Sequence, residues 1–197
     1  MTEALTEIRI HGRGGQGNVL AAYALATAAI GEGQWAQAFP AFGAERRGAP
    51  VAAFVRISPE PHLRRCQISQ PHFLIVQDET LIHIPGILDG LREGGGLLLN
   101  TGRRPEDIPE IDRIRTYTLP ATQLALEHVG IPLPNVALLT AFARLTGLLG
   151  TDSLVTALGQ RLDEEILQKN RALIDAVCTL IPSPAWEVTT ATGEASH

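Results

Sequence analysis

Cysteine is scarce in this chain of 197 residues, which contains only Cys66 and Cys178. The two cysteines lie far apart and form no C-x-x-C pair. A disulfide framework, a zinc site or an iron–sulfur cluster needs more cysteines or a closer spacing, so this chain alone cannot build any of them. The scarcity also favours a reducing, cytoplasmic environment.

Runs of positive charge and long apolar runs are missing too. The chain has 21 acidic and 16 basic residues, a net charge of −5, and no basic cluster of the kind that binds nucleic acid. No stretch of about 18 apolar residues occurs, and the acidic residues 1–7 lack the apolar core of a signal peptide. We therefore expect a soluble cytoplasmic protein with neither a membrane nor a nucleic acid as partner.

Common active-site motifs are absent as well. The sequence has no G-x-S-x-G elbow of a serine hydrolase. Its histidines His62, His72, His83 and His128 show no metal-ligand spacing. Because no acid/base pair stands out either, we predict no catalytic residue and no metal ligand in this chain.

A glycine-rich turn is the most informative feature that the chain does have. Glu7 to His11 alternates polar and apolar residues as a strand does, and residues 19–29 are rich in helix formers. The sequence Gly12-Arg13-Gly14-Gly15-Gln16-Gly17 joins the two segments and fits G-x-G-x-x-G. In this motif the first glycine makes the tight turn, the second lets backbone approach a phosphate, and the third allows close packing. An anion is the natural occupant of such a turn.

The motif lacks the acidic residue that a dinucleotide site requires. That residue lies about 20 positions past the glycines, at the end of the second strand, where it binds the ribose hydroxyls. We place the second strand at Gln34 to Phe39, and its end, Gln37-Ala38-Phe39-Pro40, contains no Asp or Glu; Glu32 falls too early. NAD and FAD are therefore disfavoured. The turn either binds another phosphate-bearing group or serves only chain reversal and packing.

The pattern along the chain predicts an α/β fold that is Rossmann-like, with a mostly parallel sheet, flanking helices and a helical C-terminal third. Predicted strands cover residues 7–11, 34–39, 51–57, 73–76, 97–99 and 113–118. Predicted helices cover residues 19–29, 81–92 (interrupted around Pro85-Gly86), 122–128, 135–149, 152–162 and 164–180. We expect one domain over residues 1–181 and a flexible tail over residues 182–197.

Charged and polar residues near the predicted strand ends are further candidates for ligand binding. Arg46 and Arg47, in a loop between Gly43 and Gly48, suit a phosphate or carboxylate, but also fit a solvated or subunit-contact loop. Asp78 follows the fourth strand, where it either meets a ligand or caps the next helix.

Two residues in and beside the glycine turn have competing interpretations. Gln16 either donates to a phosphate or satisfies the turn, and His11 is better explained as structural than as catalytic. The candidate cofactor-binding residues are thus Gly12, Arg13, Gly14, Gly15, Gln16, Gly17, Arg46, Arg47 and Asp78.

An ordered set of motifs closely resembles the gamma subunit of pyruvate and related 2-oxoacid:ferredoxin oxidoreductases. The set comprises the glycine turn, Gly43-Ala44-Glu45-Arg46-Arg47-Gly48 and Val55-Arg56-Ile57-Ser58. Further landmarks extend the resemblance over residues 8–176: Asp78, Gly96, Asn100-Thr101, Asn135 and Asn170. Two positions depart from the family pattern, because Ala44 stands where proline is common and Asn18 where valine is usual.

The resemblance implies an enzyme that converts a 2-oxoacid and coenzyme A to an acyl-CoA and CO₂ and passes electrons to ferredoxin. In the family, thiamine diphosphate lies between alpha and beta subunits, and [4Fe-4S] clusters are held by beta and a ferredoxin-like delta subunit. This chain would then contribute assembly and contacts to coenzyme A, while its partners select the oxoacid. The alternatives are a stand-alone NAD-dependent dehydrogenase and an assembly module with no ligand.

Overall fold

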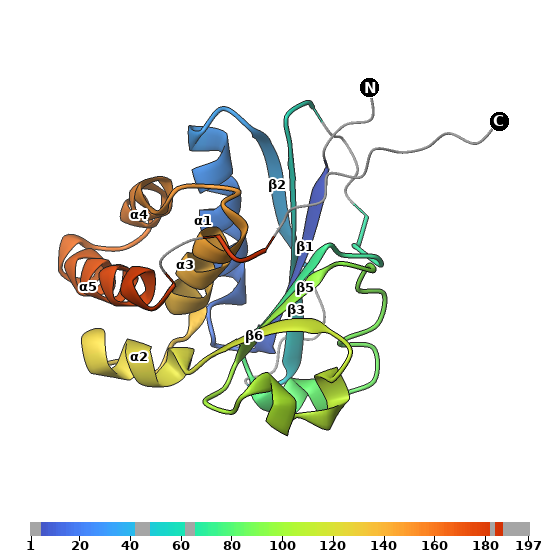
Figure 1. The fold of residues 1–197 in the computed structure, drawn as a ribbon. Coiled ribbons are helices and arrows are strands. Elements are labelled where there is room, and N and C mark those ends of the chain that lie inside the picture. Colours follow the sequence, from blue (N-terminus) through green and yellow to red (C-terminus); the bar gives the residue numbers. More distant parts are fainter. Residues whose placement is uncertain (1–4, 42–47, 62–65, 182–183, 187–197) are drawn as a thin grey trace.

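The chain folds around a six-stranded sheet in a computed structural model that describes residues 5–41, 48–61, 66–181 and 184–186 (Figure 1). Its elements, with η denoting a 3-10 helix, are β1 (Thr6–Arg13), α1 (Asn18–Gly31), β2 (Trp35–Pro40), β3 (Pro50–Ser58), β4 (Phe73–Val76), η1 (Glu79–His83), β5 (Gly96–Asn100), η2 (Pro105–Asp107), η3 (Pro109–Ile111), β6 (Arg115–Leu119), α2 (Ala121–His128), α3 (Asn135–Thr146), α4 (Thr151–Gly159) and α5 (Glu164–Leu180).

The sheet is mostly parallel, as the sequence predicts, but one strand runs the other way. The strand order is β2-β3-β1-β4-β5-β6. Strands β1, β4, β5 and β6 pair in parallel, whereas β3 pairs antiparallel with both β1 and β2. No helix of the described chain connects β2 to β3, and strands joined without a crossover run antiparallel. The predicted alternation therefore holds where a helix or 3-10 helix follows a strand, after β1 and from β4 onward. It does not hold between β2 and β3.

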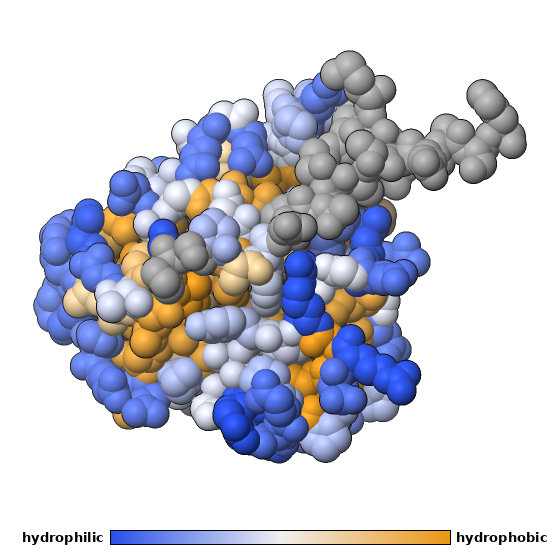
Figure 2. Space-filling view, viewed as in Figure 1, coloured by the Kyte–Doolittle hydropathy of each residue, from blue (hydrophilic) through white to orange (hydrophobic). Residues whose placement is uncertain are grey.

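The α-helices all lie on one side of the sheet (Figure 1). Ile8 and Ile10 of β1 face them, and pack with the alanine-rich α1 and the fully buried Phe142 of α3 into the main core. The opposite side has a smaller core, in which Leu74 and Val76 of β4 pack against η1 and the segments around η2 and η3. Figure 2 shows apolar surface between α2 and α5 and a hydrophilic outer face on α4 and α5.

The predicted helix over residues 81–92 is wrong. Only η1 forms there, and bends and turns follow it to Gly95. Proline has no backbone N–H and disfavours helical geometry at the residue before it, so Pro85 stops the helix after its first turns. Gly86 then takes a positive φ of 90°, which continues the turn.

The packed part of the domain continues past the boundary at residue 181 expected from the sequence. Trp186 is only 6% exposed, and its ring stacks on Phe73 with centroids 5.7 Å apart. A Cβ at Gly96 would lie 2.8 Å from the Trp186 ring, so only glycine leaves room for this contact. The backbone N–H groups of Ala185 and Trp186 both donate to the Leu145 carbonyl. Residues 187–197 lie outside the described chain.

None of the helices in the described ranges combines the length and the apolar character needed to cross a bilayer.

The two tryptophans allow a matched test of the C-terminal packing. We expect Trp186→Ala to lower the free energy of unfolding by about 3–5 kcal/mol, because a buried ring is lost from its contacts with Phe73 and Gly96. Trp35→Ala serves as the control, since Trp35 is 55% exposed, and it should cost less than about 1 kcal/mol. Urea unfolding of the full chain measures both. Equal losses in the two variants would contradict a docked Trp186.

Candidate functional site

The glycine turn brings the end of β1 and the start of α1 into unusually close contact. A Cβ at Gly12 would lie 2.3 Å from Oδ1 of Asn18, and a Cβ at Gly17 would lie 2.3 Å from Nδ2 of Asn135 in α3. Gly17 also has a φ of 78°, in the left-handed region that favours glycine. The third glycine thus allows packing against α3 rather than against a strand, which the motif alone did not predict.

The middle of the turn is paired with the chain that leads into β3. The N–H of Gly14 donates to the Ala49 carbonyl at 2.9 Å, and the Gly14 carbonyl accepts from the N–H of Gly48 at 3.3 Å. The N–H of Gly14 is therefore already used within the protein and is not free for a phosphate. Gln16 also has an internal role, because its Oε1 accepts from the Arg13 N–H at 2.7 Å. The Oε1 of Gln16 thus satisfies the turn, and donation from its amide group to a phosphate stays a prediction.

The N-terminus of α1 is left without a side-chain cap. Gly17 occupies the cap position and has no side chain that could accept from the first turn, and no acidic residue lies in that turn. The first N–H groups of a helix have no partner within the helix, and together with the helix dipole they attract an anion. The helix end can therefore take a phosphate or carboxylate from outside the chain.

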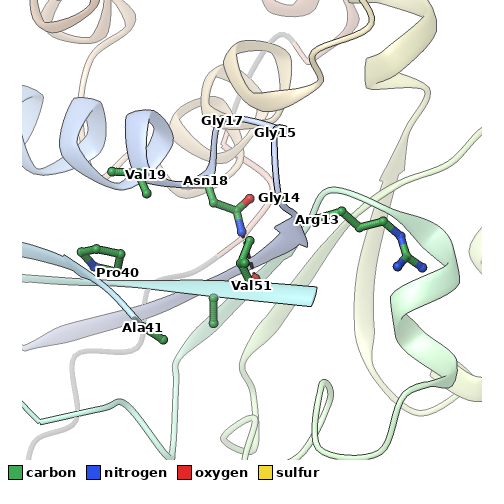
Figure 3. Close-up of a pocket in the computed structure, with 10 residues that line it drawn as sticks. Arg13, Gly14, Gly15, Gly17, Asn18, Val19, Pro40, Ala41 and Val51 are labelled. Atoms are coloured by element: carbon green, nitrogen blue, oxygen red, sulfur yellow. Dashed lines mark hydrogen bonds between the residues drawn. The ribbon is translucent and has the colours of Figure 1, made fainter. Parts of the chain in front are cut away.

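A cavity of about 460 Å³ opens beside this helix end (Figure 3). It is enclosed by the glycine turn, the first residues of α1, the end of β2 and the start of β3. Its lining residues are Arg13, Gly14, Gly15, Gly17, Asn18, Val19, Pro40, Ala41, Val51 and Ala52. Gly15 faces open space, since a Cβ there would meet no atom within 4 Å. The cavity thus combines the partial positive charge of a helix N-terminus with apolar walls from two strands.

Arg13 is held at the rim of the cavity by an ion pair. Its Nε lies 2.8 Å from Oδ2 of Asp78, and its other guanidinium nitrogens donate to Thr80 Oγ1 at 2.5 Å and to the Gly48 carbonyl at 3.0 Å. In Figure 3 its side chain points away from Val51 and Pro40. The guanidinium is therefore fixed beside the cavity and not within it.

Asp78 caps η1, which is one of the two roles considered for it from the sequence. Its Oδ1 accepts from the N–H of Thr80 at 3.0 Å and from the Thr80 hydroxyl at 2.5 Å. Burial raises the pKa of the Asp78 carboxyl, but the hydrogen bonds from Thr80 and Arg13 and the charge of Arg13 outweigh burial and hold this pKa below its usual range. Asp78 is thus ionised at neutral pH and occupied by partners in this chain.

His11 lies in β1, immediately before Gly12. The residue is only 6% exposed, and its Nε2 has no hydrogen-bond partner among the described residues. Burial and the positive charge of Arg9 lower the pKa of His11 to about 4. A neutral, buried imidazole fits the structural role favoured from the sequence.

The remaining sequence candidates are only partly testable from the geometry. Arg46 and Arg47 lie outside the described residues, although Ala41 and Gly48 on either side of them are at the cavity and the glycine turn. Sequence reasoning missed the apolar walls Pro40 and Val51, for which a ligand motif gives no signal. In the described part of the chain, no three His, Cys, Asp or Glu side chains are placed to share a metal ion.

The sheet topology adds a second argument against a dinucleotide. In a dinucleotide-binding sheet, the ribose-binding acid stands on the strand beside β1. Here β3 occupies that place, and Arg13 of β1 pairs with Pro50 at its start. Strand β2 lies one position farther out and ends at Pro40 without an acidic residue.

A family model described as pyruvate ferredoxin/flavodoxin oxidoreductase matches residues 7–180. The chain belongs to this family. It is a gamma-type subunit of a 2-oxoacid:ferredoxin oxidoreductase complex, in agreement with the resemblance seen in its sequence.

Curated relatives from archaea align over most of their length. The chain is 45% identical to pyruvate synthase subunit PorC of Methanothermobacter marburgensis over 166 residues, covering 84% of this chain and 92% of the relative. It is 43% identical to the pyruvate/ketoisovalerate oxidoreductases common subunit gamma of Pyrococcus abyssi, covering 84% and 91%. The alignment therefore spans nearly a whole gamma subunit.

Solved structures share the fold. Pyruvate oxidoreductase subunit PORC of Thermotoga maritima superposes with a TM-score of 0.77 at 34% identity, over 88% of this chain and 94% of that one. A gamma subunit of a keto/oxoacid ferredoxin oxidoreductase from Geobacter sulfurreducens gives a TM-score of 0.67 at 27% identity, with the same coverage.

Several landmarks of this gamma subunit have packing roles. Asn135 lies under Gly17, Gly96 makes room for Trp186, and Asn100 joins the end of β5 to the start of α2 by accepting from the N–H of Thr122 at 3.2 Å. Asn170 is buried in α5, where its side chain donates to the Ile166 carbonyl at 2.8 Å. None of these four residues lines the cavity.

The low pKa of His11 predicts an acid-sensitive stability. In the unfolded chain His11 becomes protonated below about pH 6.5, whereas in the folded protein it stays neutral down to about pH 4. The unfolded state therefore binds more protons over this range, and the free energy of unfolding should fall by up to about 3 kcal/mol as the pH is lowered through it. His11→Leu should reduce this slope, whatever its effect on stability at neutral pH. Urea unfolding at several pH values measures it. A slope that His11→Leu leaves unchanged would contradict this role of His11.

Proposed function

We propose that this gamma subunit contributes to assembly and binds the nucleotide part of coenzyme A in the cavity beside the glycine turn. The complex would convert a 2-oxoacid and coenzyme A to an acyl-CoA and CO₂, with two electrons passed to ferredoxin. The observation that carries the proposal is the uncapped N-terminus of α1 at the mouth of a cavity of about 460 Å³.

The chemistry of coenzyme A matches the walls of this cavity. Its phosphates are anions and would be attracted by the N–H groups in the first turn of α1. Arg13 would lie beside them at the rim of the cavity. The remaining parts of coenzyme A are less polar and suit Val19, Pro40 and Val51. The missing ribose carboxylate and the inserted β3 speak against the competing NAD-dependent dehydrogenase.

The other cofactors belong in this proposal to partner chains. Two distant cysteines cannot ligate a [4Fe-4S] cluster, and we assign the clusters and thiamine diphosphate to alpha, beta and delta-type subunits in the cytoplasm. Thiamine diphosphate supplies carbanion stabilisation when bound. The role of this chain is therefore to place coenzyme A, and not to carry out the decarboxylation.

Filling the cavity tests the proposal. Val19 and Ile30 are both exposed on α1, at 40% and 56%, but only Val19 lines the cavity. In the purified complex, we expect Val19→Trp to raise the KM for coenzyme A on the order of tenfold or more, and the matched Ile30→Trp to leave it unchanged. Iron and thiamine content report assembly. A Val19→Trp complex with full cofactor content and the wild-type KM would reject this cavity as the coenzyme A site.

Alanine substitutions in the basic loop separate ligand binding from assembly. If Arg46 or Arg47 contacts a coenzyme A phosphate, its replacement by alanine should raise the KM for coenzyme A on the order of tenfold, as expected for loss of a charge-assisted hydrogen bond of about 1.5–3 kcal/mol. Oxoacid decarboxylation without coenzyme A should survive. If the arginines contact a partner subunit, the variants should instead lose iron and thiamine from the complex. Wild-type kinetics and assembly in the double variant would contradict both roles.

A further inference from the structure

Asn18 joins the two walls of the cavity. It is the first residue of α1 and it is 4% exposed. Its Nδ2 donates to the Val51 carbonyl of β3 at 3.0 Å. Its Oδ1 packs against Gly12, where a Cβ would lie only 2.3 Å from this oxygen and therefore does not fit. A valine has the volume to fill this position but offers neither hydrogen bond.

The same side chain connects the turn to the carboxyl end of the parallel strands. Nε2 of Gln77, the residue after β4, donates to Oδ1 of Asn18. The Gln77 carbonyl accepts from Nδ2 of Asn100, at the end of β5, at 2.8 Å. Nδ2 of Asn100 also donates to Thr122 Oγ1 at 2.7 Å, at the start of α2. A continuous row of hydrogen bonds therefore runs from β3, through Asn18, to α2.

The position of β3 relative to α1 sets the width of the cavity. Val51 and Ala52 form its wall on β3, while Gly17 and Val19 form its wall on the helix. The bond from Asn18 to Val51 is a direct link between these walls, since Asn18 lies between them in Figure 3. Hydrogen bonds from one buried side chain to several elements help to hold those elements in one arrangement.

We propose that Asn18 is a positioning residue, which holds the N–H groups of α1 and the wall of β3 at the separation that the ligand needs. The proposal rests on the proposed binding of coenzyme A in this cavity. Asn18 acts through backbone groups and through Val51 and Gln77, and not by touching the reacting atoms. The hydrogen bonds through Gln77 and Asn100 connect Asn18 to the carboxyl ends of β4 and β5.

The test combines kinetics with backbone hydrogen exchange in the purified complex. We expect Asn18→Val to raise the KM for coenzyme A on the order of tenfold while kcat at saturating coenzyme A stays within about twofold. Without ligand, amides of residues 12–20 and 49–52 should exchange faster, while amides of α5 do not change. Gln77→Met, which removes the donor to Oδ1 but leaves the bond to Val51, should have a smaller effect of the same kind.

Asn170→Val is the matched control. It also removes a buried amide, but one whose side chain bonds only within α5. It should leave the KM and the exchange of residues 12–20 at wild-type values.

The possible failures are distinguishable. If coenzyme A fails to protect residues 12–20 of the wild-type complex from exchange, the proposed binding site is rejected. If protection occurs but Asn18→Val changes neither the exchange without ligand nor the KM, the binding site stands and the positioning role of Asn18 is overturned. The positioning role is also overturned if Asn18→Val speeds the exchange of residues 12–20 but leaves the KM for coenzyme A unchanged.

Discussion

The close approach of α1 to the end of β1 is the constraint on which the rest of the structure depends. Gly12 and Gly17 each leave a space that an asparagine side chain fills, from Asn18 in one case and from Asn135 in the other. Asn135 of α3 thus packs against Gly17, a residue that also lines the cavity. The alanine-rich buried face of α1 continues this close contact along the sheet.

The insertion of β3 beside β1 converts a familiar motif into a different site. The residues that lead into β3 pair with Gly14, so that one of the N–H groups expected to meet a phosphate is used internally. It also supplies Val51 and Ala52 as an apolar wall where a dinucleotide site has its ribose-binding strand. A glycine-rich turn identifies a strand-to-helix connection, while the neighbouring strand decides which ligand fits it.

Buried polar groups on the sheet are neutralised or bonded locally, which keeps the floor of the site rigid. Arg9 is 8% exposed and donates to the Ile87 and Asp89 carbonyls at 2.9 and 2.7 Å. Burial lowers its pKa, and its positive charge helps to keep His11 neutral. Asp78 remains ionised because Thr80 and Arg13 satisfy it. The charges of Arg13 and Asp78 thus balance each other beside the N-terminus of α1.

The sequence by itself determined the local features of this protein: the strand-turn-helix around Gly12 to Gly17, the apolar strands β4 and β5, the amphipathic α5 and the family. Each structural feature depends on spacing within one short segment, and the family on an ordered set of such segments, so the residues carry the information directly. Only the tertiary structure decided the place and direction of β3, the contact of Asn135 with Gly17, the link from Asn18 to Val51 and the docking of Trp186. These depend on contacts between residues far apart in the chain, for which a single sequence holds no periodic signal.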